Sequence, residues 1–174
     1  MSALHDDSNV ARITVPMQPH GQQRHRSRAF IQNVRGTPKA QATQYDPKPN
    51  TIAKRKIQTA VNAALRARGP AWDCTGPMRV TITAFWKCLS PLKRSVRPAK
   101  WRAKKPDADN VAKAVLDACN GILWLDDNQV VDLRVLKIED KQGRPSRVEI
   151  TAERILQEEV AVATLDALIH ARIV

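Results

Sequence analysis

Residues 106–132 read PDADNVAKAVLDACNGILWLDDNQVVD, and this stretch predicts a helix, a tight turn and the beginning of a strand. Four apolar side chains recur at spacings of four, three and four residues, which places them on one helical face: Val111, Val115, Ala118 and Ile122. After the turn, Val131, Leu133 and Val135 alternate with polar residues, as in a strand. A helix with one apolar face beside such a strand is expected to pack on a sheet.

The same patterns extend the fold towards the N-terminus. Alternating apolar and polar residues predict strands at Val10–Val15 and Met78–Leu89. Between them, an amphipathic stripe that ends at a Gly-Pro pair predicts a helix over about 49–68. These elements supply more of the sheet and a second helix to cover it.

The remaining segments are two loops, one further strand and a last helix. Residues 17–48 and 90–105 are basic, contain Pro and lack apolar periodicity, so we expect long loops. Apolar alternation returns at 148–152 after the turn-rich DKQGRPS, and we expect this strand to form a hairpin with the strand at 131–135. Residues 156–174 have helical spacing, and this helix would pack either on its own core or on a partner subunit.

Together these elements predict an α/β (α+β) fold, in which helices pack against a small mixed sheet in the order β-α-β-α-β-β plus a C-terminal helix. At 174 residues the chain suits one domain. We expect a flexible tail at 1–9, a single domain at 10–155 and a C-terminal helical extension at 156–174.

Charge divides the chain into two parts of opposite sign. Residues 1–105 carry 21 Lys and Arg against 4 Asp and Glu, whereas residues 106–174 carry 8 against 13. The net charge of +12 and the pI of about 10.2 are typical of a protein that binds a polyanion such as nucleic acid. No segment combines a basic face with a wide apolar one, so we expect no membrane partner.

Other classes of protein find little support. The first residues are polar, and no run approaches the ~18 consecutive apolar residues of a transmembrane helix, so we expect a cytoplasmic protein. The histidines are scattered, and we expect neither a His-based metal site nor a small-molecule cofactor. Three cysteines lack paired or metal-ligand spacing, which predicts free, buried or partly buried thiols: Cys74, Cys88 and Cys119.

Four carboxylates stand in two pairs, Asp107 with Asp109 and Asp126 with Asp127. A spacing of two puts the first pair on one side of an extended chain that enters the helix. We expect the returning chain to bring the second pair to the same end of the sheet. Like charges gathered there would raise one another's pKa unless a cation binds, and hard oxygen ligands favour Mg²⁺ or Mn²⁺.

Plainer roles remain open for these residues. Asp109 stands where an N-cap residue is expected, and Asp126 and Asp127 could form a solvent-exposed acidic turn. Lys113 lies four residues after Asp109 and four before Asp117. It could therefore form an ion pair on the helix, or stabilise charge on a phosphate.

The stretch KPDADNVAKAVLDACNGILWLDDNQVVDL resembles the signature of the RusA family of Holliday junction resolvases, and the likeness extends over about Lys104–Lys137. It includes D-x-D-N-x-x-K, L-D-A and W-x-D-D-x-Q-V-V-D. ITVP at 13–16 is similar to the family's opening strand, YDP at 45–47 to its Tyr-x-Pro element, and GQQRHRSR at 21–28 stands in place of its Arg-Pro-Arg segment. The resemblance implies a compact α/β homodimer that cuts four-way DNA junctions with Mg²⁺, for which Mn²⁺ could substitute.

Carried over position by position, the resemblance implies metal-binding acids at Asp107, Asp109 and Asp127, with Asp126 in support, and a catalytic lysine at Lys113. Basic residues elsewhere are expected to hold DNA mainly through its phosphates. They are Arg24, Arg26, Arg28, Lys54, Arg55, Lys93, Arg94, Arg97, Lys100, Arg102, Lys104 and Lys105.

These observations predict a structure-selective, Mg²⁺-dependent endodeoxyribonuclease that resolves Holliday junctions by paired phosphodiester hydrolysis in a homodimer. Its expected partners are branched DNA and a second copy of the chain, in a bacterial host cell and with a phage or prophage gene as a possible source. Two rivals remain. One is a branched-DNA-binding module without catalysis, in which the acids are caps and turns, and the other is a metal-dependent nuclease that prefers flaps or replication forks.

Overall fold

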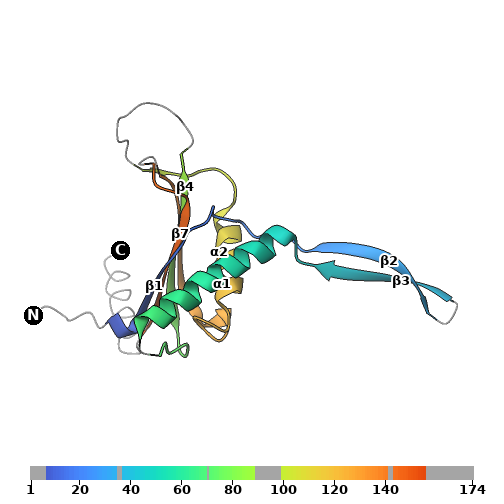
Figure 1. The fold of residues 1–174 in the computed structure, drawn as a ribbon, viewed down its shortest axis with the longest axis horizontal. Coiled ribbons are helices and arrows are strands. Elements are labelled where there is room, and N and C mark those ends of the chain that lie inside the picture. Colours follow the sequence, from blue (N-terminus) through green and yellow to red (C-terminus); the bar gives the residue numbers. More distant parts are fainter. Residues whose placement is uncertain (1–6, 35–36, 70, 89–98, 141–142, 156–174) are drawn as a thin grey trace, which may run out of the picture.

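The computed structural model shows a mixed α+β fold, in which two helices pack on a five-stranded sheet and a two-stranded ribbon projects from this body (Figure 1). The fold class predicted from the sequence is confirmed. The structure describes residues 7–34, 37–69, 71–88, 99–140 and 143–155. Within these ranges, no helix combines the length and the apolar character needed to cross a membrane.

The main sheet has the strand order β1-β7-β4-β6-β5. Its strands are β1 (Val10–Val15), β4 (Met78–Lys87), β5 (Lys100–Trp101), β6 (Val130–Asp140) and β7 (Arg147–Arg154). The central strand β4 buries every second side chain, as its alternating sequence predicted. It pairs antiparallel with β7 and parallel with β6, and a parallel pair requires a crossover connection.

The predicted hairpin between the last two strands is wrong. β7 lies between β1 and β4, whereas β6 lies on the other side of β4, so β6 and β7 do not pair. Two alternating strands joined by a short turn look the same in sequence whether they pair with each other or flank a third strand. Here both strands pair with β4, whose inward-facing side chains are apolar.

The helices α1 (Lys48–Arg68) and α2 (Ala108–Cys119) contact each other and share one core on the same face of the sheet. Ile57 and Val61 from α1 meet Val111 and Val115 from α2 in this core, together with the inward side chains of β4. The helix predicted over about 49–68 and the helix predicted to follow Asp109 are therefore confirmed. Cys119 is buried in this core, and burial raises the pKa of its thiol to about 12.

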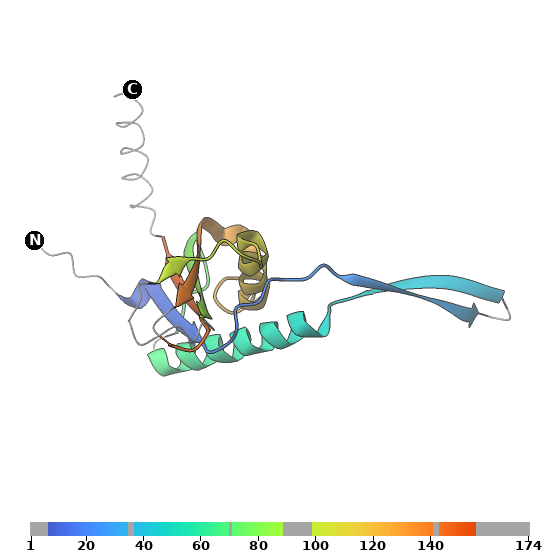
Figure 2. The ribbon, with the colours of Figure 1, turned by 90° about the horizontal axis from the view of Figure 1, so that it is seen from above.

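The long loop predicted for 17–48 is wrong over most of its length. Residues 26–45 form an antiparallel ribbon of β2 (Arg26–Val34) and β3 (Thr37–Tyr45), which extends far from the body (Figure 2). Both faces of this ribbon are solvent-exposed, so its sequence has no need of apolar alternation and gives no strand signal. The second predicted loop, 90–105, contains the short strand β5 at its end.

Several predicted features lie outside the described residues. The C-terminal helix at 156–174 is one, and three of the predicted DNA-binding residues, Lys93, Arg94 and Arg97, are others. In the predicted N-terminal tail, Asp7–Asn9 form the 3-10 helix η1, which precedes β1 directly.

Candidate functional site

The first acid pair lies at the N-terminal end of α2, with both side chains exposed. Asp107 is the N-cap residue, with extended backbone at φ −72° and ψ 157°, and Asp109 lies inside the first helical turn. The sequence predicted Asp109 as the N-cap residue, whereas the N-cap residue in the structure is Asp107, two residues earlier. The Asp107 side chain is exposed and makes no capping hydrogen bond to α2, so the helix does not occupy its carboxylate.

Arg102 holds the segment that leads to Asp107. Its guanidinium stacks on Trp86 with 4.6 Å to the ring centroid, and its Nη1 donates to Glu139 Oε1 at 3.1 Å. Its Nη2 donates to a carbonyl of the segment itself at 3.0 Å. The neighbouring Lys100 forms an ion pair with Glu139 at 3.1 Å and lowers the pKa of that carboxyl. Both predicted DNA-binding cations are thus engaged within the protein.

The second acid pair lies in the turn between α2 and β6, where Asp127 begins the 3-10 helix η2 (Asp127–Gln129). A hydrogen bond with the Asp126 carboxyl raises the pKa of Asp127. Partial desolvation and the negative charges of Asp126 and Asp117 raise it further. The turn therefore concentrates negative charge from two segments of the chain, with the repulsion predicted for a cation site.

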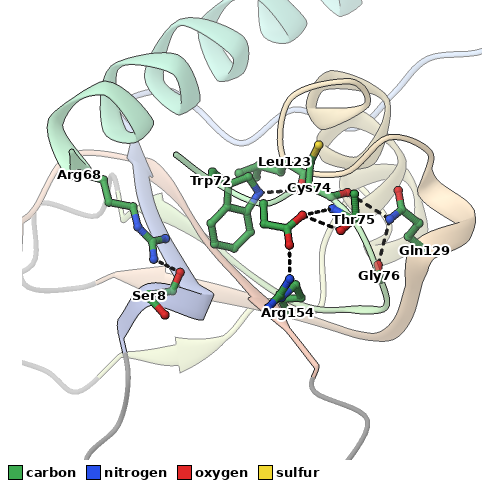
Figure 3. Close-up of polar contacts among 10 residues, drawn as sticks. Ser8, Arg68, Trp72, Cys74, Thr75, Gly76, Leu123, Gln129 and Arg154 are labelled. Atoms are coloured by element: carbon green, nitrogen blue, oxygen red, sulfur yellow. Dashed lines mark hydrogen bonds and ion pairs between the residues drawn. The ribbon is translucent and has the colours of Figure 1, made fainter. Parts of the chain in front are cut away.

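Gln129, which the sequence analysis did not single out, fixes this acidic turn. Its Oε1 accepts hydrogen bonds from the N–H groups of Leu125 at 2.7 Å and Asp126 at 3.0 Å. Its Nε2 donates to the carbonyls of Cys74 at 3.1 Å and Gly76 at 2.9 Å, between which it lies in Figure 3. One amide thus ties the acids to the segment before β4. The sequence feature that could have indicated a role for Gln129 is its place in the family motif W-x-D-D-x-Q.

The two acid pairs do not meet within one chain. Asp109 and Asp117 are eight residues apart on α2, which is about 12 Å along the axis, and Asp117 is the α2 acid whose charge raises the pKa of Asp127. In Figure 1 the chain enters α2 at one end and continues into the acidic turn from the other. Among the described residues, no three Asp, Glu, His or Cys side chains converge as a metal-binding group.

The reason for this separation is the crossover to β6. The chain must travel back along the sheet before it can begin a strand parallel to β4, and α2 makes that passage. The expectation that both pairs reach the same end of the sheet is therefore not met by a single copy. Lys113 lies on α2 between the pairs, is exposed, and forms no ion pair with a described residue.

A polar cavity of about 350 Å³ lies between α2 and the base of the ribbon, by which we mean the residues that precede β2 and follow β3. Gln22 Nε2 donates to Asp117 Oδ2 at 2.6 Å across it. The buried Asn50 bonds the ring of His20 at 2.8 Å and the carboxylate of Asp46 at 2.6 Å. The cavity is lined by His20, Gln22, His25, Asp46, Asn50, Lys54, Ala114, Asp117 and Asn120.

Other predicted DNA-binding residues are exposed at three places: the ribbon and its base, α1, and the segment before α2. They are Arg24, Arg26, Arg28, Lys54, Arg55, Lys104 and Lys105. Lys54 also lines the polar cavity.

An α+β domain with exposed acid pairs, an exposed lysine between them and many exposed cations among its described residues is typical of proteins that bind nucleic acid. Comparison with known families assigns it further. The chain belongs to the endodeoxyribonuclease RusA family, whose profile matches residues 16–153.

Two relatives share part of this region. The uncharacterized protein YqaN of Bacillus subtilis (strain 168) is 35% identical over 86 residues, which cover 43% of this chain and 58% of that protein. The crossover junction endodeoxyribonuclease rusA of Lactococcus phage r1t is 30% identical over 76 residues, which cover 43% of this chain and 54% of that protein. Each match thus spans little more than half of the relative's length.

Proposed function

We propose that this protein is a structure-selective endodeoxyribonuclease that resolves four-way DNA junctions by paired hydrolysis of phosphodiester bonds in a homodimer. The observation that carries the proposal is the family match over residues 16–153, which includes both acid pairs and Lys113. The named activity of the phage relative and the strongly basic N-terminal part of the chain support the same substrate.

The acids fit a divalent cation in their chemistry. Asp107, Asp109 and Asp127 offer exposed carboxylate oxygens, the ligands that Mg²⁺ prefers and that Mn²⁺ also accepts. The pKa of Asp127 is raised first by its hydrogen bond with the Asp126 carboxyl, and the negative charges of Asp126 and Asp117 add a repulsion that a bound cation would relieve. Asp126 would support the site, and the ion when bound supplies an activated water and neutralises charge on the phosphate. Lys113, which is exposed and forms no ion pair with the residues that the structure describes, would donate to the same phosphate.

A two-fold dimer would provide what a single chain lacks. In an isologous interface each contact occurs twice. If the N-terminal end of α2 from one copy lies on the acidic turn of the other, two identical sites form, each with Asp107 and Asp109 from one copy and Asp126 and Asp127 from its partner. Two symmetry-related sites suit two equivalent strands of a four-way junction.

The proposal is tested with labelled four-way junction, flap and plain duplex substrates of matched sequence, incubated with Mg²⁺, with Mn²⁺ or with chelator. We expect paired nicks in the junction that depend on the metal. Asp107→Asn and Asp127→Asn should bind the junction almost as well as the wild type and lose cutting by a factor of about 10² or more.

A matched control is Glu149→Gln, which removes a carboxylate from the sheet face opposite to α1 and α2 and should cut normally. Wild-type protein that binds junctions but never cuts them would favour a DNA-binding module without catalysis. Faster cutting of flaps or forks than of four-way junctions would favour the other rival, a nuclease of different preference.

A further inference from the structure

We propose that the ribbon of β2 and β3 grips DNA with one defined face: the face that carries Arg26, Arg28 and Lys39 lies on the phosphates of a duplex arm, and the opposite face stays away from the DNA. This inference rests on the proposed function only in taking DNA as the partner. It adds Lys39 to the predicted DNA-binding residues and assigns their side chains to one surface.

The pairing register of the ribbon defines the two faces. Side chains directly opposite each other in an antiparallel pair project to the same face, and successive residues project to opposite faces. Arg26 pairs with Tyr45, and Gln32 pairs with Lys39, so all three cations share one face with Tyr45. The cationic face consists of Arg26, Arg28, Phe30, Gln32, Lys39, Gln41, Thr43 and Tyr45.

The opposite face carries no charge and is built mainly from small side chains. This small-residue face consists of Ser27, Ala29, Ile31, Pro38, Ala40, Ala42 and Gln44. Both faces are exposed along the ribbon, so burial in the body of the protein does not explain why the cations gather on one of them.

Charge identifies the kind of partner. Residues 26–45 contain no Asp or Glu, and within the described part of the chain Arg26, Arg28 and Lys39 form no ion pair. A second copy that met this face through its own ribbon would bring like charges together, because an isologous contact repeats the same surface. A polyanion is the complementary partner, and each phosphate that a cation neutralises releases counterions.

Dimensions agree with a duplex arm. A nine-residue strand extends about 30 Å, which is close to the ~34 Å of one turn of DNA. Arg26 and the position of Lys39, opposite Gln32, lie six residues apart along β2, or about 20 Å. Phe30 lies between Arg28 and that position, where an exposed ring can pack on sugar or base.

The base of the ribbon is bonded to the helix that carries the first acid pair. The Gln22 N–H donates to the Asn110 carbonyl at 2.9 Å, and the Gln22 side chain donates to Asp117 at 2.6 Å. A duplex held by the ribbon would therefore keep a fixed relation to α2. The ribbon would position one arm of the junction while the acids act near the crossover.

The test moves each cation across the ribbon without changing composition or net charge. The face-swapped chain carries R26S with S27R, R28A with A29R, and K39A with A40K. Junction and duplex affinity are measured by fluorescence anisotropy in chelator over a series of salt concentrations. We expect at least about tenfold weaker binding at 0.1 M salt. The slope of log binding constant against log salt concentration should become shallower by up to about 2.7, because each of three lost phosphate contacts contributes about 0.9. Unchanged affinity and slope would overturn the proposal.

A matched gain of charge provides a second test that does not depend on a triple variant. Gln41 lies on the cationic face and Gln44 on the small-residue face, both on β3. Gln41→Lys should tighten binding by up to about eightfold at 0.1 M salt, and Gln44→Lys should change it by less than about twofold. Equal gains from the two would show that net charge alone matters and would overturn the sidedness.

Two further results separate the possible failures. If the face swap keeps DNA affinity but alters the oligomeric state measured by light scattering, the ribbon serves the second copy and the proposal is wrong. If the wild type never cuts DNA and the swap still weakens binding, the proposed nuclease function fails while the ribbon assignment stands.

Discussion

Replacing Gln129 tests whether the acidic turn is held as the structure indicates. Gln129→Ala removes four hydrogen bonds, two donated by the N–H groups of Leu125 and Asp126 and two accepted by the carbonyls of Cys74 and Gly76. At ~0.5–1.5 kcal/mol for each bond, and with partial compensation by water at a half-buried site, we expect a loss of about 2–4 kcal/mol in the free energy of unfolding.

For a chain of this size such a loss corresponds to a fall of roughly 5–15 °C in melting temperature. Cutting should fall by about 10–100-fold, as is typical when the partners that orient metal-binding carboxylates are removed. Circular dichroism during thermal and urea unfolding measures the first effect, and single-turnover cleavage of a four-way junction measures the second.

Gln129→Glu is the matched variant, because it keeps the acceptor oxygen for Leu125 and Asp126 and replaces the donor. At pH 7 its carboxylate would face two carbonyls beside an acidic turn, so we expect its pKa to be raised in the folded state. A group with a raised folded pKa destabilises the fold as pH rises above its unfolded value. The deficit in melting temperature should therefore shrink as the pH falls through this raised folded pKa, and it should be smallest below about pH 4, where the carboxyl is protonated in both states. A stability of Gln129→Ala within about 0.5 kcal/mol of the wild type would refute the reasoning.

Three other perturbations have defined outcomes. Because the pKa of Asp127 is raised above 3.8 in the folded chain, Asp127→Asn should raise the melting temperature at pH 7 in chelator, and calorimetry should show the gain disappearing below about pH 3.8, where both states are protonated. Gly21→Ala would place a Cβ 2.3 Å from Pro106 Cβ, so it should displace the residue next to Asp107 and lower the cutting rate about tenfold or more; an unchanged rate in the cleavage assay would contradict this contact. Trp124→Phe loses the bond from the fully buried indole Nε1 to Asn120 Oδ1 at 2.6 Å, and urea unfolding should show a loss of about 1–3 kcal/mol.

The buried elements could be predicted from the sequence because burial imposes their periodicity. β4 and α2 must place apolar side chains at every second position or on one helical face, and both were predicted close to their observed bounds. The same pattern does not determine which strands pair with each other. β6 and β7 alternate as a hairpin would, and only the presence of β4 between them decides their places in the sheet.

The ribbon was missed for a related reason. Its residues are exposed on both faces, so neither face demands apolar side chains, and its Arg, Gln and Pro content is typical of a loop. The sequence predicted two of its cations, Arg26 and Arg28, as DNA-binding residues, and it gave no such indication for Lys39. The pairing register gives what composition lacks, because it shows that Arg26, Arg28 and Lys39 share a face.

The roles of the candidate site residues stay predictions, and the arrangement expected for them within one chain differs from the observed one. Spacing and resemblance indicate the acid pairs and Lys113, but the rise of about 12 Å along α2 between Asp109 and Asp117 separates the first pair from the acidic turn. The role of Gln129 depends on carbonyls more than fifty residues earlier in the chain, which no local pattern reveals.

The most direct test of the central claim, that acids from two copies complete each cutting site, is complementation between two inactive variants. One carries Asp107→Asn and Asp109→Asn, and the other carries Asp126→Asn and Asp127→Asn. After subunit exchange, a mixed dimer would contain one site with all four wild-type acids. We predict that an equal mixture recovers about a quarter of the wild-type nicking rate on a four-way junction with Mg²⁺. A mixture of confirmed mixed dimers that remains as inactive as either variant alone would contradict the account.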